Sequence, residues 1–448
     1  MKIKRITKIA VALLIIMAIL LAGCDSIGKK NSDEQEVKKK LYFYYPRDGS
    51  HIIKRCIIEY NKLHENVEVI GLEGSGKRTA FNEKLNELRE AGETVPDIIM
   101  IHDTWLAEMA SKEILRPLDG GMTENKKNEF FKGMYDAMIW KGKTYGLPIW
   151  QDVPLLYYRK DLIDSPPDSW DELSQTAKKL LKSGIEYGLI FPGETQESAS
   201  AFLGGIWTFY NAYPDFEAED IKFNEQALSS ALGDLKNMVK NGVITPDTLS
   251  MNAEDCRMAF EGGNAAFMWN WSYAARLFIN EESPLFGKVG VAPLPASTAE
   301  NPDSGIISGY ALAMSKDSGL IPEAWSFMEY LISDDVQREI AKSGLMPAKK
   351  SLYNIYWLDQ LGLPHVFTEL LEAGHALKPG RSADGIINMM SQALSLAVGE
   401  NKSISDLIKF INEGVVAEEK TEEPVQEGED AEDGSQAGNN GEDNDEGE

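Results

Sequence analysis

Short apolar runs alternate with segments of helical spacing along the first part of this chain. Asp97–Ile101 is almost continuously apolar, as expected for a strand that is buried on both faces. Leu41–Tyr45 and Val67–Ile70 are two further strand candidates, and His51–Leu63 carries apolar side chains at the spacing of a helix. Strands that alternate with helices predict a parallel sheet covered by helices.

The same alternation starts again after Tyr145. Leu155–Tyr158 and Tyr187–Phe191 are strand candidates, and Ser169–Lys182 is a helix candidate that begins with a capping box, Ser169 to Glu172. The part between the polar ends is about 375 residues long, enough for two units with separate cores. The sequence therefore predicts two α/β halves, and we expect more than one crossing between them.

The N-terminal residues indicate export. A basic start is followed by the apolar run Ile9–Leu21 and then by Leu21-Ala22-Gly23-Cys24. A helix that spans a membrane needs roughly 20 apolar residues, and this run is shorter. The segment resembles the bacterial lipobox, which implies a signal peptide over residues 1–23 and a lipid, such as palmitate, on Cys24. Residues 24–40 are polar and are expected to form a flexible tether.

The C-terminal end is strongly acidic. Residues 417–448 contain 14 acidic side chains and one lysine, so they carry half of the chain's net charge of −26. A segment with so little apolar surface is expected to be disordered. We interpret it as a solvated tail, and a docking role for a cationic partner or a divalent ion stays open. An acidic chain of this kind argues against nucleic acid as a partner.

Cysteine and histidine are sparse. Cys56 and Cys256 lie in segments with helical spacing and are expected to be buried thiols rather than a disulfide. The five histidines form no pattern typical of metal ligands. We therefore expect neither a catalytic metal nor any other cofactor.

Aromatic rings stand beside carboxylates and amides at three places in the sequence. These places are Trp269-Asn270-Trp271-Ser272-Tyr273, Trp150-Gln151-Asp152 and His102-Asp103-Thr104-Trp105. Flat rings cover the apolar faces of a sugar, and carboxylates bind its hydroxyl groups through strong charge-assisted hydrogen bonds. The combination favours a carbohydrate site over ordinary core packing.

Carboxylates in pairs also cleave glycosidic bonds, so a cell-surface glycoside hydrolase is an alternative. Asp103, Asp152 and Glu197 are available for such a role, but nothing in the sequence marks one of them as a desolvated acid. We therefore expect a binding protein and not an enzyme. A binding protein for a solute other than a sugar is the second alternative.

Several short motifs together carry a family resemblance. They are Val95–Asp103, Gly142–Pro148, Leu155–Leu162, Pro167–Leu173, Phe260–Met268, Ala292–Pro295 and Glu323–Phe327. In this order and spacing, the chain resembles the family 1 extracellular solute-binding proteins, the group that contains the maltose- and trehalose-binding proteins.

The resemblance implies an α/β fold of the class II periplasmic-binding-protein type, with two lobes, a ligand cleft between them and a hinge of several crossings. The N-terminal lobe would take residues 41–150 and 310–345. The C-terminal lobe would take residues 151–309 and 346–416. The crossings would lie near Gln151–Pro154, Gly305–Gly309 and Met346–Lys350.

The resemblance and the aromatic sets together give a candidate ligand-binding set. Its members are Arg47, Asp48, Asp103, Trp105, Trp150, Asp152, Glu197, Trp269, Trp271, Tyr273 and Arg381. The chain departs from the maltose-binding protein, because Lys378–Arg381 replaces an aromatic stretch and Thr104 stands where that protein has an arginine after the aspartate. A sugar other than maltodextrin is therefore expected.

The resemblance also implies a role. The protein would be anchored by lipid on Cys24 at the outer face of a bacterium's cytoplasmic membrane. It would act there as a monomer without a cofactor, capture a mono- or oligosaccharide by hinge closure, and deliver it to the membrane permease subunits of an ABC importer.

Overall fold

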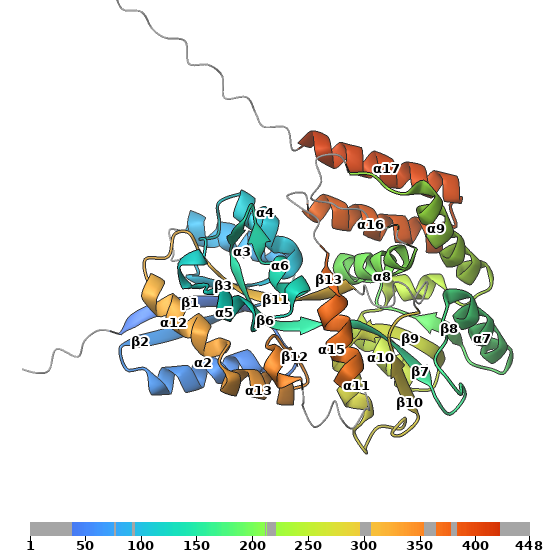
Figure 1. The fold of residues 1–448 in the computed structure, drawn as a ribbon, viewed down its shortest axis with the longest axis horizontal. Coiled ribbons are helices and arrows are strands. Elements are labelled where there is room, and N and C mark those ends of the chain that lie inside the picture. Colours follow the sequence, from blue (N-terminus) through green and yellow to red (C-terminus); the bar gives the residue numbers. More distant parts are fainter. Residues whose placement is uncertain are drawn as a thin grey trace, which may run out of the picture.

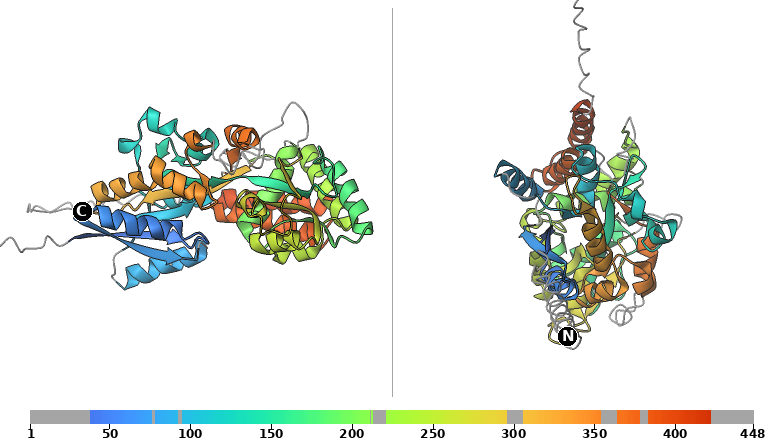
Figure 2. Two further views of the ribbon diagram at one scale, coloured as in Figure 1. Left: turned by 90° about the horizontal axis from the view of Figure 1, so that it is seen from below. Right: turned by 90° about the vertical axis from the view of Figure 1, so that its left-hand side faces the viewer.

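The computed structural model describes residues 38–75, 78–91, 95–210, 212, 221–295, 306–353, 364–377 and 383–421. Within these ranges the strands form a seven-stranded sheet, a four-stranded sheet and a two-stranded hairpin, β4 (Ile139–Trp140) with β5 (Lys143–Thr144). The two larger sheets lie in separate halves that follow one another along the long axis of the molecule (Figures 1 and 2).

The seven-stranded sheet has the order β12-β6-β11-β3-β1-β2, and β13 pairs with β11. Its strands are β1 (Lys39–Pro46), β2 (Val67–Gly74), β3 (Ile98–His102), β6 (Gly146–Asp152), β11 (Ile306–Met314), β12 (Met346–Pro347) and β13 (His375–Ala376). β1 is parallel to β2 and β3, whereas β11 is antiparallel to both β3 and β6.

Helices cover both faces of this sheet. α2 (Ile52–Leu63), α12 (Ile321–Leu331) and α13 (Asp334–Lys342) bury their apolar side chains against one face, around Phe43, Met100 and Phe327. α3 (Arg78–Glu90), α4 (Leu106–Ser111), α6 (Lys132–Asp136) and α15 (Pro364–Ala373) contribute to the core on the other face. The short helix α5 (Glu124–Lys127) begins at Thr123, whose side chain accepts a hydrogen bond from the backbone N–H of Lys126.

The four-stranded sheet has the order β10-β7-β9-β8. Its strands are β7 (Pro154–Arg159), β8 (Tyr187–Ile190), β9 (Ala265–Trp271) and β10 (Val289–Ala292). The core on one side is shared with α7 (Trp170–Lys182), α8 (Gln196–Phe209), α9 (Glu225–Lys240), α16 (Ala383–Val398) and α17 (Ile404–Thr421). α10 (Ala253–Glu261) and α11 (Tyr273–Phe278) contribute to the core on the other side.

The two halves are joined where β6 ends and β7 begins. Only Val153 separates β6 in the larger sheet from β7 in the smaller one. The returning chain enters the larger sheet through β11, where Ser308 pairs with Asp152. One apolar cluster runs through this region, because it includes Ile101 and Ile307 of the larger sheet together with Leu155 and Met268 of the smaller one.

The expectation of a parallel sheet is confirmed for the strands from which it was made, because β1 is parallel to both β2 and β3, but it does not extend to most of the later strands. β8 with β9 is the parallel pair of the smaller sheet, and β6, β7, β10 and β12 have antiparallel partners. The physical reason is the return of the chain from the second half. A strand that comes back across the junction enters the first sheet from the opposite end, so β11 runs against β3 and β6.

Two smaller findings concern the cysteines and the membrane. Cys56 and Cys256 are both free and buried, in line with the expectation of buried thiols, and burial raises the pKa of each thiol to about 12.

No helix among the described residues combines the length and the apolar character that a membrane crossing requires. Cys24 and the acidic residues after Thr421 lie outside the described residues.

Candidate functional site

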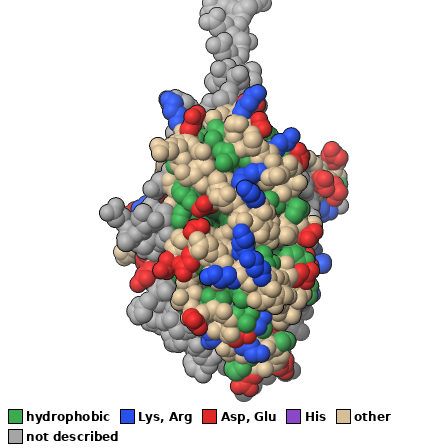
Figure 3. Space-filling model, turned by 90° about the vertical axis from the view of Figure 1, so that its right-hand side faces the viewer, with side chains coloured by type: hydrophobic (Ala, Val, Ile, Leu, Met, Phe, Trp, Pro, Cys, Tyr) green, Lys and Arg blue, Asp and Glu red, His purple; other side chains and the backbone are tan. Residues whose placement is uncertain are grey.

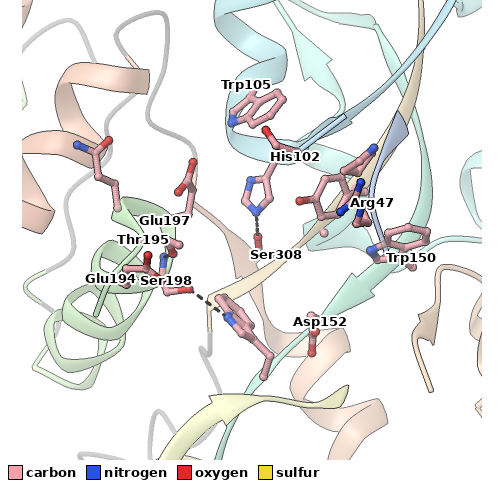
Figure 4. Close-up of a pocket in the computed structure, with 16 residues that line it drawn as sticks. Arg47, His102, Trp105, Trp150, Asp152, Glu194, Thr195, Glu197, Ser198 and Ser308 are labelled. Atoms are coloured by element: carbon pink, nitrogen blue, oxygen red, sulfur yellow. Dashed lines mark hydrogen bonds between the residues drawn. The ribbon is translucent and has the colours of Figure 1, made fainter. Parts of the chain in front are cut away.

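A cavity of about 610 Å³ lies between the two halves and has walls from both. This volume is within the range of sites that hold small organic ligands. Figure 4 shows side chains that point into it from separate strands and from a helix. The lining residues are Pro46, Arg47, Ser75, His102, Trp105, Trp150, Asp152, Glu194, Thr195, Gln196, Glu197, Ser198, Trp271, Ser308, Gly309 and Tyr310.

The larger sheet supplies one wall from the ends of its strands. Arg47 follows the last residue of β1, and His102 is the last residue of β3. The carboxyl ends of parallel strands meet at one edge of a sheet, which is the usual place for a ligand in open α/β folds. Trp150 of β6 and Tyr310 of β11 add two rings whose centroids are 5.4 Å apart, at an angle of 55°.

The smaller half supplies the opposite wall from the start of α8 and the end of β9. Thr195 caps α8 by accepting a hydrogen bond from the backbone N–H of Ser198. The Ser198 hydroxyl in turn accepts a hydrogen bond of 3.3 Å from the indole Nε1 of Trp271. This bond fixes the ring at the cavity, with Glu197 on the same helical turn.

Asp152 lies at the junction of the two halves. Its Oδ1 accepts hydrogen bonds from the backbone N–H of Val153 at 3.0 Å and of Ser272 at 2.7 Å, and from the Ser272 hydroxyl. Burial raises the pKa of Asp152 to about 7, although these hydrogen bonds act in the opposite direction. All three bonds reach one oxygen, so Oδ2 keeps its capacity to accept hydrogen bonds from a ligand in the cavity.

A second polar network supports the wall around His102. The Asp103 carboxylate accepts hydrogen bonds from the Ser308 hydroxyl at 2.9 Å and from the Gly309 N–H at 3.3 Å. His102 Nδ1 lies 3.0 Å from the same carboxylate, and Nε2 lies 3.1 Å from the Ser308 hydroxyl. Burial lowers the pKa of His102, but the Asp103 and Glu197 carboxylates outweigh it and raise the pKa above its ordinary value.

The cavity brings together six residues of the candidate set derived from the sequence. They are Arg47, Trp105, Trp150, Asp152, Glu197 and Trp271. Asp103 lies behind the wall, where its side chain is fully buried and positions His102 and Ser308. Arg381 lies outside the described residues.

Three further candidates lie away from the cavity for reasons of local structure. Trp269 is fully buried and packs against Phe202, because it lies two residues before the end of β9, on the same face as Trp271 but deeper in the core. Asp48 accepts hydrogen bonds from Ser50 and from the N–H of Ile52, at the start of α2. Tyr273 begins α11 and packs into the core between the halves.

Sequence reasoning passed over several lining residues. Tyr310, Ser308 and Gly309 reach the cavity because β11 inserts between β3 and β6, a pairing that no local pattern reveals. Thr195 and Ser198 did carry a signal, since a threonine before an apolar run is typical of the start of a helix. Among the described residues, no group of three or more His, Cys, Asp or Glu could hold a metal ion.

The chain was compared with known proteins. A binding protein of Brucella abortus is 28% identical over 365 residues, which cover 79% of this chain and 86% of that protein. The arabinooligosaccharide-binding protein of Bacillus subtilis is 23% identical over 73% of this chain and 76% of its own length. The maltose-bound T. maritima MalE3 has a TM-score of 0.70 and 26% identity, and the match covers 84% of this chain and 99% of that one.

These similarities confirm the two-lobe α/β fold class and the expectation of a binding protein rather than an enzyme. The profile of the family described as bacterial extracellular solute-binding protein matches residues 50–338, which is well over half of the sequence. The chain therefore belongs to the bacterial extracellular solute-binding protein family.

Proposed function

We propose that this protein captures a mono- or oligosaccharide in the cavity between its two halves and delivers it to an ABC importer. The observation that carries the proposal is the composition of the cavity wall, where indole and phenol rings alternate with carboxylates, a histidine and an arginine. The sugar ligands named for the Bacillus subtilis relative and for the T. maritima structure support the same class of ligand.

The rings would bind the apolar faces of a sugar. Trp150 and Tyr310 stand on the larger sheet, whereas Trp271 stands on the smaller one. Rings on opposite walls can cover both faces of a pyranose or furanose ring. Each ring that packs on the ligand contributes a binding free energy of about 25 cal/mol for each Å² of apolar area that is buried.

The polar side chains would bind the hydroxyl groups at the rim of the sugar. Asp152 and Glu197 are acceptors and Arg47 is a donor, whereas His102 holds the Ser308 hydroxyl in the wall. Buried polar groups that meet a matching hydroxyl contribute strongly to discrimination, because a ligand without that hydroxyl leaves them unpaired. The mixed donors and acceptors favour a neutral polyhydroxylated ligand over a strongly charged one.

Ligand-driven closure of the halves is the proposed mechanism. A sugar bound to one wall gains contacts with the other only when the halves approach, so it shifts the population toward the closed form. We propose lobes of residues 41–150 with 310–345 and of residues 151–309 with 346–416. Their boundaries would lie close to the β6–β7 junction and the start of β11. Within the second range, β12 lies at the proposed crossing near Met346–Lys350 and pairs with β6, and β13 pairs with β11, so both short strands would belong to the connection between the lobes.

We also propose that Cys24 carries the lipid that anchors the protein outside the cytoplasmic membrane. The support is the export segment with its Leu-Ala-Gly-Cys end, together with a family whose members are extracellular. A Cys24→Ala variant should leave the membrane fraction and appear in the medium or periplasm. Retention of that variant in the membrane would contradict the anchor.

The ligand is tested by calorimetric titration of the full chain with a panel of saccharides and of non-sugar solutes. The panel includes arabino-oligosaccharides, maltose and short peptides. The proposal expects at least one saccharide to bind with micromolar affinity or better. If no saccharide binds and a non-sugar solute does, the proposal is overturned in favour of another transported solute.

A further inference from the structure

A strip of lysines crosses the end of the molecule that is farthest from the larger sheet. Blue side chains follow one another down the middle of this face in Figure 3, and red ones lie mainly toward its edges. Five exposed or half-exposed lysines on the elements at this end define the strip: Lys178 and Lys182 of α7, Lys236 and Lys240 of α9, and Lys402 just before α17; Lys179 and Lys409 on the same helices are exposed as well. The strip stands out because the chain as a whole carries a net charge of −26.

Hydrogen bonds hold these helices and their lysines side by side. Lys178 Nζ donates to the Asn241 side chain at the end of α9. Lys236 donates to the Asn401 side chain, next to Lys402. The five lysines therefore belong to one continuous surface and not to three separate helices.

Most lysines of this strip have no ion-pair partner among the described residues, although α7 and α9 also carry exposed carboxylates near their first turns, such as Asp171 and Glu225. Among the described residues, no carboxylate forms an ion pair with Lys178, Lys182 or Lys240, whereas Lys402 lies 3.4 Å from Glu400. The Asp234 carboxylate on α9 accepts a hydrogen bond from the Tyr210 hydroxyl. A lysine near the C-terminal end of a helix also interacts favourably with the helix dipole. If this were the only role of these lysines, the strip would stay open to solvent.

We propose that the acidic C-terminal segment of the same chain, residues 422–448, docks on this lysine strip. That segment holds 12 acidic residues and neither lysine nor arginine. It follows α17, which packs against α9 and begins directly after Lys402 and Ser403. The segment and the strip therefore have opposite charge, and the strip lies near the start of the helix to whose end the segment is attached.

The segment is long enough to reach the strip. α17 has 18 residues, so the chain must return about 27 Å along it, at 1.5 Å per residue. An extended segment of 27 residues spans up to roughly 90 Å. Because the segment is tethered close to the strip, its effective concentration there is in the millimolar range, which favours many weak ion pairs acting together.

Docking of this kind would cover the cationic surface formed by the lysine strip. The strip lies on α7, α9 and the start of α17, and none of these lines the cavity between the halves. Sugar binding is therefore expected to be independent of docking. The inference does not rest on the proposed function, and failure of one would leave the other intact.

The test is lysine footprinting of the full chain at low salt, with acetylation of each lysine measured by mass spectrometry. In one variant all carboxyl side chains of residues 422–448 are replaced by the corresponding amides. Acetylation of Lys178, Lys182 and Lys240 is expected to become at least threefold faster in that variant, and Lys54 and Lys143 on the other half are expected to be unchanged. A variant with the segment's sequence scrambled but its charge kept should retain the protection.

Salt provides a second arm, because exposed ion pairs are screened within about 10 Å at 0.1 M and more strongly above it. Protection should disappear in 0.5 M sodium chloride. Equal acetylation rates in the wild type and the amide variant would overturn the proposal. So would protection that arises only when phosphatidylglycerol vesicles are added, since the strip would then be a site for lipid headgroups.

Discussion

At the scale of single residues, Asp152 lines the cavity and also affects the stability of the fold through its raised pKa. Its carboxyl has an ordinary pKa of 3.8 and a pKa of about 7 in the fold, where burial disfavours the charged form. Between these pH values the folded state binds a proton that the unfolded state has lost. This group therefore makes the protein less stable as the pH rises from about 4 to about 7, and the loss is complete above 7.

Asp152→Asn should remove this pH dependence. We expect the variant to match the wild type at pH 4.5 and to be more stable at pH 8 by about 1–2 kcal/mol. One pKa unit corresponds to about 1.36 kcal/mol, and we reduce the full value for the shift because solvent at the cavity screens the charge. Urea unfolding at both pH values measures the difference. Asp161→Asn is the control of opposite sign, since the Arg159 guanidinium holds the pKa of Asp161 below its usual range and its pairing stabilises the fold at pH 8.

Trp269 and Trp271 offer a matched pair on one strand. Trp271 faces the cavity, so Trp271→Ala should weaken saccharide binding by at least tenfold, about 1.4 kcal/mol, with little loss of stability. Trp269 is buried, so Trp269→Ala should lower the free energy of unfolding by about 3–5 kcal/mol. Calorimetric titration and thermal melting separate the two effects. Equal loss of affinity in a folded Trp269→Ala and in Trp271→Ala would contradict the assignment of the two rings.

At the scale of elements, two buried glutamines join β12 to its surroundings. Gln337 Nε2 donates to the Ile149 carbonyl at 2.9 Å, and its Oε1 accepts from the Ala348 N–H at 2.8 Å. Gln151 Nε2 donates to the Pro347 carbonyl at 3.0 Å and to the Tyr353 hydroxyl at 2.6 Å. β12 has only two residues, so these side chains replace ladder hydrogen bonds that a longer strand would make.

Gln337→Met keeps the shape of the side chain and takes a hydrogen-bond partner from three backbone groups, the carbonyls of Ile149 and Leu331 and the N–H of Ala348. Each such group costs about 1–3 kcal/mol, so the free energy of unfolding should fall by at least 2 kcal/mol. Gln337 does not line the cavity, and saccharide affinity should stay within twofold of the wild type. Arg338→Met, at the neighbouring exposed position of α13, is the control and should change stability by less than 1 kcal/mol. A Gln337→Met variant as stable as that control would contradict the role of the glutamine.

The elements that sequence reasoning located are those with a local signal. Asp97–Ile101 was expected as a buried strand because its apolar run is continuous, and β3 lies at Ile98–His102. The helix over Ser169–Lys182 also follows from its pattern, although Glu172 accepts its hydrogen bond from the N–H of Asp168 and not from that of Ser169. Strand direction has no such signal, because it depends on the path by which the chain returns to the first sheet.

In the site too, some residues have a local sequence signal, and others reach the cavity only through the path of the chain. Trp150 was accessible to sequence reasoning because a ring beside an amide and a carboxylate is typical of a sugar site, and Arg47 followed from the family resemblance. Tyr310 and Ser308 were not, since they face the cavity only through the insertion of β11 between β3 and β6. Trp269 and Trp271 show the limit at one-residue resolution. The sequence places both in an aromatic cluster, and both rings lie on the same face of β9, so the point at which the strand ends decides that Trp271 reaches the cavity while Trp269 stays in the core.

At the scale of the whole molecule, the division of the cavity wall between two halves determines how the protein should respond to ligand. His102, Trp150 and Tyr310 belong to one half, and Glu197 and Trp271 to the other. In the proposed mechanism, a sugar that contacts one wall gains the remaining contacts only when the halves close. A ligand that binds the closed form about 10⁴-fold more tightly shifts the equilibrium from 1:99 to 99:1.

Saturating saccharide should therefore reduce the radius of gyration measured by small-angle X-ray scattering of the full chain. Trp271→Ala removes contacts from the second wall while leaving the first wall intact, so a saccharide at a saturating concentration should occupy this variant and yet close it less completely. Occupancy is checked by calorimetry on the same samples. If wild-type scattering profiles with and without a bound saccharide superimpose, the halves do not close around the ligand. If Trp271→Ala closes as fully as the wild type at equal occupancy, the second wall does not drive closure.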